Sequence, residues 1–149
     1  MRSLIRSPRK SMRPPNRLRI LAVDDEASVL EVLASCLEVS GHSVDTCSNA
    51  PAALERFDGR RWDLVMTDRV MPGMNGLEFA AAIKRISACT PVIMMTGSAD
   101  SARPGGNSSI DAILPKPFTM AALQYAVASV TERKDSLHAG DPLSAGLFN

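Results

Sequence analysis

Residues 21–25 read Leu21-Ala22-Val23-Asp24-Asp25, and this short apolar run ends on two neighbouring acids. A second run, Leu64-Val65-Met66-Thr67, is followed directly by Asp68. If both runs form neighbouring parallel strands, the three carboxylates meet at one carboxyl edge, where open α/β sheets bind their ligands. Carboxylates crowded in a cleft repel one another and need a cation, and ligation by oxygen alone favours Mg²⁺. These runs therefore predict an α/β sheet with a metal-dependent site at its edge.

The composition is that of an ordinary globular protein. The chain has 149 residues, 45% of them hydrophobic and 22% charged, which is enough for one domain with a real core. No apolar run is long enough to span a membrane, and the first residues lack the apolar stretch of a secretory signal. The cysteine usage predicts a cytoplasmic protein. The three cysteines form no CxxC pair. We therefore expect reduced, buried thiols rather than disulfides or a zinc site.

Charge divides the chain into unequal parts. Residues 1–19 contain seven basic side chains and no acid, which leaves ten basic against 16 acidic residues in the rest. We expect a basic, disordered arm over residues 1–17, a folded domain over 18–132 and a flexible tail over 133–149. The arm has three interpretations. It is a plain disordered extension (with Met12 as an alternative start), a weak contact for nucleic acid or another anionic surface, or a transit segment, which Pro14-Pro15 disfavours.

Strand-like runs alternate with segments of helical spacing along the domain. Strands are expected at residues 18–23, 43–47, 64–67, 91–95 and 110–114. Helices are expected at residues 29–37, 52–57, 77–83 and 119–130. Asn49 and Thr119 stand near the starts of two helices, and Gly41 follows the end of the first. This alternation predicts a parallel sheet covered on both faces.

One unit breaks the alternation. Residues 98–109 contain no Leu, Ile, Val, Met or Phe, and Pro104-Gly105-Gly106 stands where a fourth helix would lie. Proline and glycine strongly disfavour a helix interior. We therefore predict a mobile loop or a single turn in this segment.

Two further polar side chains follow strands at the same edge. Thr96 ends the fourth strand and Lys116 follows the fifth. A carboxylate nucleophile with a hydroxyl, an ammonium and Mg²⁺ suits phosphoryl transfer, because the oxygens of the transferred group need cations and hydrogen-bond donors. Taken alone, Thr96 or Lys116 would more often be an ordinary surface or strand-end residue, and Asp25 or Glu26 could simply cap a helix. The combination carries the prediction.

Four motifs resemble the receiver domain of two-component response regulators. They read Asp24-Asp25-Glu26, Asp68-Arg69-Val70-Met71-Pro72-Gly73-Met74-Asn75-Gly76, Met95-Thr96-Gly97 and Leu114-Pro115-Lys116-Pro117-Phe118. Each is weak alone, but the four occur in the family's order within residues 18–132. The resemblance implies a flavodoxin-like (CheY-like), doubly wound, five-stranded parallel sheet in the order 2-1-3-4-5, with helices on both faces.

The resemblance also implies an acceptor and a metal site. Asp68 would be the phosphoacceptor, which takes a phosphoryl group from a sensor histidine kinase or a histidine phosphotransfer protein. Asp24, Asp25, Asp68 and the backbone carbonyl of Val70 would hold Mg²⁺, with Asp24 acting partly through water. Such a protein is no enzyme in the usual sense, because its chemistry is limited to Mg²⁺-dependent self-phosphorylation and autodephosphorylation.

Two more residues of the resemblance would contact the phosphoryl group. Thr96 would donate a hydrogen bond to it, and Lys116 would pair with it. The peptide bond between Lys116 and Pro117 would be cis, which X-Pro bonds can adopt.

The sequence departs from the family at three places. Ile113 stands where receivers usually carry a switch Tyr or Phe, so a rotating aromatic cannot report the state of Thr96. Thr96 and Lys116 are 20 residues apart, which is short for this family and fits a missing fourth helix. Arg69 adds a cation beside the acceptor. Output through the fourth helix and fifth strand is therefore in doubt, and phosphorylation could instead order residues 98–109 over the site.

Several functions compete. The favoured one is a stand-alone receiver that acts through phosphorylation-dependent protein interaction, with no membrane contact and nucleic acid reached only through the basic arm 1–17. The alternative is a degenerate receiver that binds partners without phosphorylation. An aspartate-nucleophile phosphohydrolase would need an acid where Val70 stands. A flavin-binding module is disfavoured because the acids after the first strand would repel the flavin phosphate. A fragment of a larger hybrid kinase is a further alternative.

Three residues outside the motifs receive structural interpretations. We expect His42 to be a surface residue rather than a phosphodonor, and Asp63 to be an exposed residue at the start of a strand. Trp62 is expected to pack in or at the rim of the core.

Overall fold

The structure is a computed structural model that describes residues 17–97 and 109–132. The expected basic arm up to residue 16, the tail 133–149 and residues 98–108 lie outside the described residues. The predicted loop in place of a fourth helix falls in that undescribed part of the chain.

Strands and helices alternate along the described chain, each within a few residues of its predicted position. The strands are β1 (Arg19–Val23), β2 (Ser43–Cys47), β3 (Leu64–Asp68), β4 (Val92–Thr96) and β5 (Ala112–Pro115). The helices are α1 (Ala27–Val39), α2 (Ala50–Arg56), α3 (Gly76–Ile86) and a last helix at residues 120–132.

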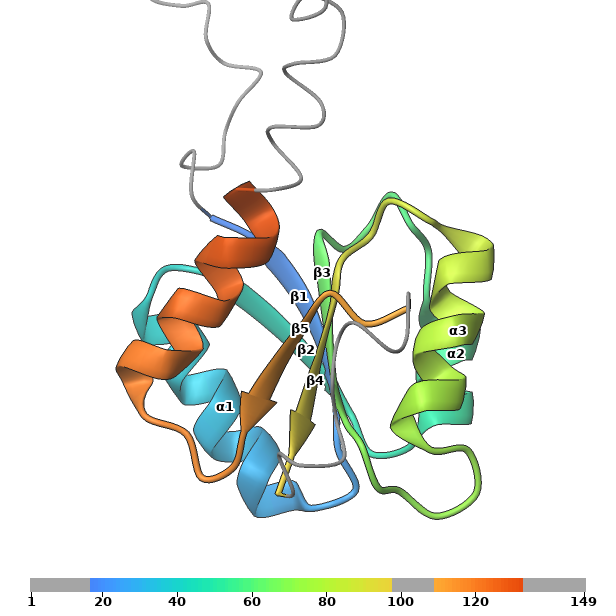
Figure 1. Ribbon diagram of the computed structural model, residues 1–149, viewed down its shortest axis with the longest axis horizontal. Helices are drawn as coiled ribbons and strands as arrows, with labels where there is room; N and C mark the ends of the chain where they lie inside the picture. Colours follow the sequence, from blue (N-terminus) through green and yellow to red (C-terminus); the bar gives the residue numbers. More distant parts are fainter. Residues whose placement is uncertain (1–16, 98–108, 133–149) are drawn as a thin grey trace, which may run out of the picture.

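The strands form one parallel sheet in the order β2-β1-β3-β4-β5, which confirms the predicted order (Figure 1). The chain moves to β2 on one side of β1 and to β3 on the other, so the connections diverge between β1 and β3. Open α/β sheets bind ligands at such a point, outside the carboxyl ends of the strands. Asp24 directly follows β1, and Asp68 is the last residue of β3.

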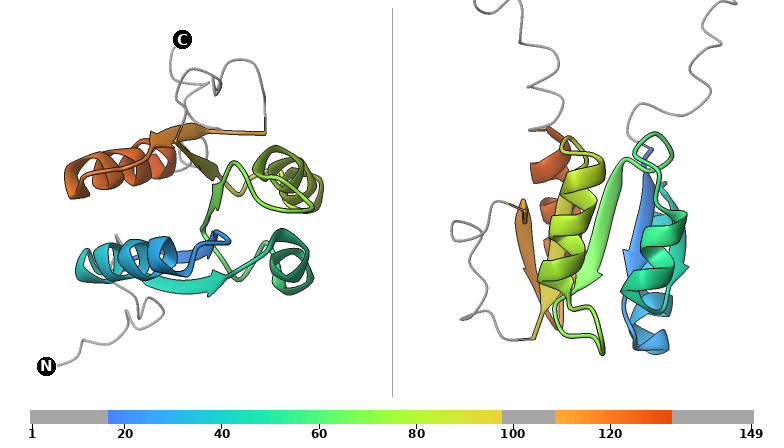
Figure 2. Two further views of the ribbon diagram at one scale, coloured as in Figure 1. Left: turned by 90° about the horizontal axis from the view of Figure 1, so that it is seen from below. Right: turned by 90° about the vertical axis from the view of Figure 1, so that its right-hand side faces the viewer.

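Helices cover both faces of the sheet (Figure 2). α1 and the last helix lie on one face, and α2 and α3 lie on the other (Figure 2). The core divides in the same way, because Ile20 and Met66 belong to the buried cluster of the first face, and Leu21 and Val65 to that of the second. Since side chains alternate along a strand, this division shows which face a strand residue points to.

Side chains near the helix starts satisfy backbone groups that the helices leave without partners. The Asn49 side chain accepts a backbone N–H in the first turn of α2, and Thr119 does the same for the last helix. Asn75 and Glu78 form a reciprocal capping box at the start of α3. Gly41 follows α1 with φ of 99°, a conformation that favours glycine. The sequence predicts the Asn49, Thr119 and Gly41 positions correctly.

At the amino edge of the sheet, side chains accept hydrogen bonds from backbone N–H groups at the strand starts. The pairs are His42 Nδ1 with Leu18 N–H (3.1 Å), Asp63 Oδ2 with Arg19 N–H (2.9 Å) and Asp111 Oδ2 with Val92 N–H (2.8 Å). Asp63 does precede β3 as expected, but His42 and Asp63 are less exposed than the sequence predicts, and both have a structural role that it does not indicate. Both are half-buried, because they satisfy donors at the start of the central strand β1.

Three smaller expectations have mixed outcomes. Trp62 is a core residue, 2% exposed and stacked on Phe57, and its Nε1–H donates to Asp45 (2.9 Å). The expectation of buried thiols is wrong for Cys89, which is exposed in the short loop after α3, and Cys36 and Cys47 are only partly buried. In the described part of the chain, no helix is long and apolar enough to cross a membrane.

Candidate functional site

The carboxyl edge brings together the three acids that the sequence singles out. Asp24 is fully buried, Asp68 is 7% exposed and Asp25 is exposed. One carboxylate oxygen of each lies within 4.8 Å of the others. They meet because β1 and β3 are neighbouring parallel strands that end side by side, with Val23 opposite Thr67.

Lys116 reaches this cluster from the segment after β5. Its Nζ lies 3.1 Å from Oδ1 of Asp68, 3.4 Å from Oδ2 of Asp24 and 3.9 Å from Oε1 of Glu26. The Lys116–Pro117 peptide bond is cis, as the resemblance implies. A single lysine therefore faces several carboxylates, and the site has excess negative charge.

Burial and charge shift two pKa values in the site. Burial raises the pKa of Asp24, against the hydrogen bond that its Oδ1 accepts from the Glu26 N–H (2.9 Å), and the charge of Asp68 raises it further. Burial would lower the pKa of Lys116, but its hydrogen bond to Asp68 and the charges of Asp24 and Asp68 outweigh that effect, so the pKa is raised. Lys116 therefore stays protonated at neutral pH, and the raised pKa of Asp24 shows that burial disfavours its charged form.

Thr96 and Val70 lie on either side of this cluster in the chain topology. Thr96 ends β4, the strand next to β3, and is 2% exposed. It lies opposite Pro115, directly before Lys116. Val70 follows Asp68 by two residues, and its side chain is 69% exposed. Every predicted site residue thus lies at the carboxyl edge or in the loop that leaves it.

The loop after Asp68 is held at both ends. The Arg69 N–H donates to the Met95 carbonyl (2.9 Å), and the Arg69 carbonyl accepts from the Gly76 N–H (2.8 Å). A side chain at position 76 would collide with the backbone carbonyl of Asp68 and with Cα of Arg69. Glycine therefore lets α3 begin directly against the end of β3.

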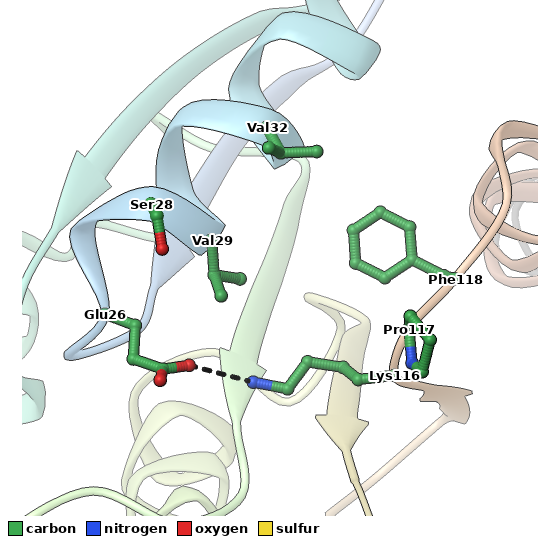
Figure 3. Close-up of a pocket in the computed structure, with 7 residues that line it drawn as sticks. All are labelled: Glu26, Ser28, Val29, Val32, Lys116, Pro117 and Phe118. Carbon is green, nitrogen blue, oxygen red and sulfur yellow. Dashed lines mark ion pairs between the residues drawn. The ribbon is translucent and has the colours of Figure 1, made fainter.

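Sequence reasoning missed a groove beside the site and the part that Glu26 plays in it. A groove of about 440 Å³ lies between α1 and the segment after β5. Figure 3 shows its lining residues, which are Glu26, Ser28, Val29, Val32, Lys116, Pro117 and Phe118. Glu26 and Lys116 form an ion pair within the groove (Figure 3), and Lys116 also contacts Asp24 and Asp68 of the acidic cluster. Glu26 forms no side-chain cap on α1, so the capping interpretation fails for it.

The acidic cluster suits Mg²⁺. An octahedral Mg²⁺ holds oxygens at about 2.0–2.1 Å, so its ligand oxygens lie roughly 3–4 Å apart. The carboxylate oxygens here lie within 4.8 Å of one another, and the three acids offer oxygen alone. Small side-chain rotations would therefore bring them to ligand distances.

A family comparison agrees with this geometry. Residues 20–128 match the family model of the response regulator receiver domain. The chain belongs to this family. It is 32% identical over 143 residues to the transcriptional regulatory protein TcrA of Mycobacterium tuberculosis, which covers 91% of this chain and 56% of TcrA. This receiver domain thus spans little more than half the length of that curated relative.

Solved receiver structures have the same fold. A response regulator receiver domain protein from Clostridium thermocellum matches with a TM-score of 0.74 and 32% identity, over 80% of this chain and 98% of that one. TrrA from Thermotoga maritima, solved in complex with Mg²⁺ and BeF, matches with a TM-score of 0.70 and 32% identity, over 75% of this chain and 97% of that one. Receiver domains bind Mg²⁺ at an acidic pocket and take phosphoryl groups from histidine kinases.

Proposed function

We propose that this receiver domain accepts a phosphoryl group on Asp68 from a histidine kinase or a histidine phosphotransfer protein and then acts through phosphorylation-dependent protein interaction. The supporting observation is the position of Asp68. Its Oδ1 lies 3.1 Å from Lys116 Nζ, and two further carboxylates lie within 4.8 Å, at the sheet edge where this fold binds ligands. An ionised oxygen beside a cation and a candidate metal site is the arrangement that phosphoryl transfer requires.

The transfer step uses Asp68 as the nucleophile. An Asp68 carboxylate oxygen forms a bond to phosphorus while the bond between phosphorus and the donor imidazole nitrogen breaks, and that nitrogen keeps the electron pair. Lys116 pairs with one phosphoryl oxygen and the Thr96 hydroxyl donates to another. Water later attacks the phosphorus, which releases inorganic phosphate and restores the carboxylate. This self-dephosphorylation is the only hydrolysis that we propose.

Mg²⁺ is the proposed cofactor. Asp24, Asp25, Asp68 and the Val70 carbonyl would hold it, and it would neutralise charge on the phosphoryl oxygens. Asp24 accepts the Glu26 N–H through Oδ1, which leaves Oδ2 to face Lys116 and the cluster. That arrangement fits a ligand that acts partly through water.

The groove next to Lys116 is the proposed surface for the protein donor. Val29, Val32 and Phe118 give it apolar walls, and Lys116 belongs to both the groove and the acidic cluster. A donor histidine must come within bonding distance of Asp68, so its helix must lie against the surface that adjoins the site. An amphipathic helix packs into such a groove through its apolar face.

Intact-mass measurement tests the acceptor assignment. The protein is incubated with Mg²⁺ and acetyl phosphate, and we expect one added phosphoryl group, stable to cold acid quenching and removed by hydroxylamine. Absence of any labelled protein under these conditions would contradict the proposal.

A second measurement tests the donor surface. Val32 is 55% exposed in the groove, and Val39 is 77% exposed on the same helix but is not among the groove residues. We expect Val32→Glu to slow transfer from a phosphotransfer protein roughly tenfold or more, because a charge enters an apolar contact. Transfer from acetyl phosphate should persist, and Val39→Glu should resemble the wild type with both donors. Equal rates for the two variants with the protein donor would exclude this surface.

Ile113 favours a second candidate, a degenerate receiver that binds its partner without phosphorylation. Ile113 lies opposite Met94 and packs at the margin of the core under α2 and α3. Because it is not aromatic, the position cannot act as an aromatic switch. A partner that binds wild-type protein and Asp68→Asn equally, with and without acetyl phosphate, would support this candidate instead.

A further inference from the structure

Arg69 lies beside Thr96 on the sheet. Asp68 is opposite Met95 in the register of β3 and β4, and the Arg69 N–H continues this ladder by donating to the Met95 carbonyl (2.9 Å). Arg69 is therefore opposite Thr96, about 4.8 Å away along the hydrogen-bonding direction. Val65 and Met94 belong to the cluster under α2 and α3. By alternation, Arg69 and Thr96 point to that same face, and Asp68, two residues after Met66, points to the other. The guanidinium must therefore turn across the carboxyl end of the sheet to approach Asp68.

The Arg69 guanidinium has no partner in the described part of the chain. Its Nε is buried and donates to no acceptor. No carboxylate of the described residues pairs with it, although Asp24 and Asp25 cluster with the neighbouring Asp68. A buried charged donor without an acceptor costs free energy. An anion at the carboxyl edge would supply the missing acceptor.

Only the side chain of Arg69 is free to respond. Its N–H and its carbonyl are both engaged, with Met95 and Gly76, and the Gly76 backbone packs directly against its Cα. The backbone is therefore held on both sides. Rotation of the long side chain about its χ angles can still move the guanidinium by several ångströms (order-of-magnitude reach of an arginine).

Phosphorylation of Asp68 changes the net charge of the site, and this change would attract the Arg69 side chain. The three clustered carboxylates together with one Mg²⁺ and Lys116 are formally neutral, and the nearby Glu26 is mostly exposed to solvent. The unphosphorylated, metal-bound site therefore has little need of a second cation. A phosphoryl group replaces one carboxylate charge with about −1.5 to −2. The phosphorylated site then has excess negative charge beside an unpaired guanidinium.

We propose that Arg69 is a second phosphoryl-binding cation, whose guanidinium turns toward the phosphoryl group on Asp68 beside Thr96. This assignment rests on the proposed function of Asp68. A planar guanidinium donates two parallel hydrogen bonds to phosphoryl oxygens, which suits it to recognition of this group. Its rotation changes the surface on the α3 side of the site. Phosphorylation is thereby reported without an aromatic residue at position 113.

Beryllofluoride, a phosphoryl mimic, tests the proposal in the full-length chain. Affinities for Mg²⁺ alone and for beryllofluoride in saturating Mg²⁺ are measured by calorimetry for the wild type, Arg69→Met, Arg69→Lys and Arg85→Met. Methionine keeps an unbranched stem and removes the charge. Arg85 is exposed at the far end of α3 and serves as the matched loss of one arginine.

We expect Arg69→Met to bind beryllofluoride about tenfold more weakly, with Mg²⁺ affinity unchanged or slightly increased. Arg69→Lys should recover part of the loss, and Arg85→Met should match the wild type. Equal beryllofluoride affinity in Arg69→Met and the wild type would overturn the proposal. So would an equal loss of Mg²⁺ and beryllofluoride binding, since that pattern indicates a structural role.

A measurement on the wild type removes any dependence on variant folding. The Nε–H proton resonance of Arg69, assigned in ¹⁵N-arginine-labelled protein, should shift downfield and exchange more slowly with water after beryllofluoride is added. An unchanged resonance in protein that binds beryllofluoride would overturn the role of Arg69 while leaving Asp68 as the acceptor. Failure of the wild type to bind beryllofluoride or accept phosphate would instead contradict the proposed function itself.

Discussion

At the amino edge of the sheet, Asp111 Oδ2 accepts hydrogen bonds from Lys84 Nζ (2.7 Å) and from the Val92 N–H (2.8 Å). At the carboxyl edge, marked by the arrowheads of β4 and β5 in Figure 1, Lys116 faces Asp24 and Asp68 at 3.4 and 3.1 Å. The first pair is balanced, with one acid for one base. In the second, one base serves several acids.

The charged groups at the amino edge stabilise the fold, whereas the excess of acids at the carboxyl edge is suited to binding a ligand. Lys84 also donates to the Thr90 carbonyl (2.8 Å), so the amino-edge network ties α3 to the start of β4. At the carboxyl edge, burial and repulsion raise the pKa of Asp24, which shows an anion held at a cost. Such a cost is tolerated where a cation or a reacting group relieves it.

The largest expected effect is the loss of phosphorylation in Asp68→Asn. The amide keeps the size of the side chain but has no ionised oxygen, so labelling by acetyl phosphate should disappear in intact-mass spectra. Asp63→Asn makes the same change at the amino edge. It should be labelled fully and lose less than about 1 kcal/mol of stability, because an amide oxygen can still accept the Arg19 N–H. Full labelling of both Asp68→Asn and Asp63→Asn would show that the acceptor does not lie at Asp68 on the carboxyl edge.

Mg²⁺ affinity should depend on the carboxyl edge alone. Asp25→Asn removes a charged ligand, and we expect at least about tenfold weaker binding by calorimetry or amide NMR shifts. Trp62 is a poor reporter because it precedes β3 at the amino end. Asp63→Asn should bind as the wild type does. Unchanged affinity in Asp25→Asn would remove this residue from the metal site.

The balanced pair should affect stability and not phosphorylation. Lys84→Met removes the ion pair between Lys84 and Asp111, whose side chains are both mostly buried, and keeps the hydrogen bond from the Val92 N–H to Asp111. We expect a loss of about 1–2 kcal/mol in urea unfolding. The rate of labelling by acetyl phosphate should stay at the wild-type value. A slower rate would show that the two edges are coupled.

Lys116→Arg should separate phosphorylation from its consequences. Arginine keeps the charge, but its broader head cannot replace a compact ammonium between Asp24 and Asp68. Labelling of Asp68 should survive while phosphorylation-dependent amide shifts become smaller. Shifts identical to those of the wild type would contradict the role of Lys116. Lys84→Arg is the matched control and should change neither measurement.

The smallest effect concerns pH. Burial lowers the pKa of His42, and the charge of Arg17 lowers it further. The folded state therefore prefers neutral imidazole, whose Nδ1 accepts the Leu18 N–H. Stability from this contact is fully present above the unfolded value of about 6.5 and is lost as pH falls through the lowered folded pKa. In urea unfolding at pH 7.5 and 5.5, His42→Asn should remove a pH dependence below about 1 kcal/mol. An unchanged pH dependence would rule out His42 as its source.

Much of the fold was predictable because its signals are local. Short apolar strand runs, helical spacing, and the turn and cap residues Asn49, Thr119 and Gly41 each depend on neighbours within a few positions. The parallel order then brings strand ends together, so the convergence of Asp24, Asp25, Asp68 and Lys116 could be anticipated from where the strands end. Boundaries shifted by a few residues because pairing across the sheet extends β4 to Thr96 and delays β5 to Ala112.

The sequence by itself therefore determined the order of elements, the residues at the strand ends and the chemistry available there. Tertiary structure decided which distant residues share an environment. His42 accepts from Leu18, Glu26 lies beside Lys116 at the mouth of a groove, and Arg69 stands opposite Thr96 with a buried, unpaired nitrogen. These outcomes depend on helix packing and strand register, which join residues that carry no signal of each other along the chain.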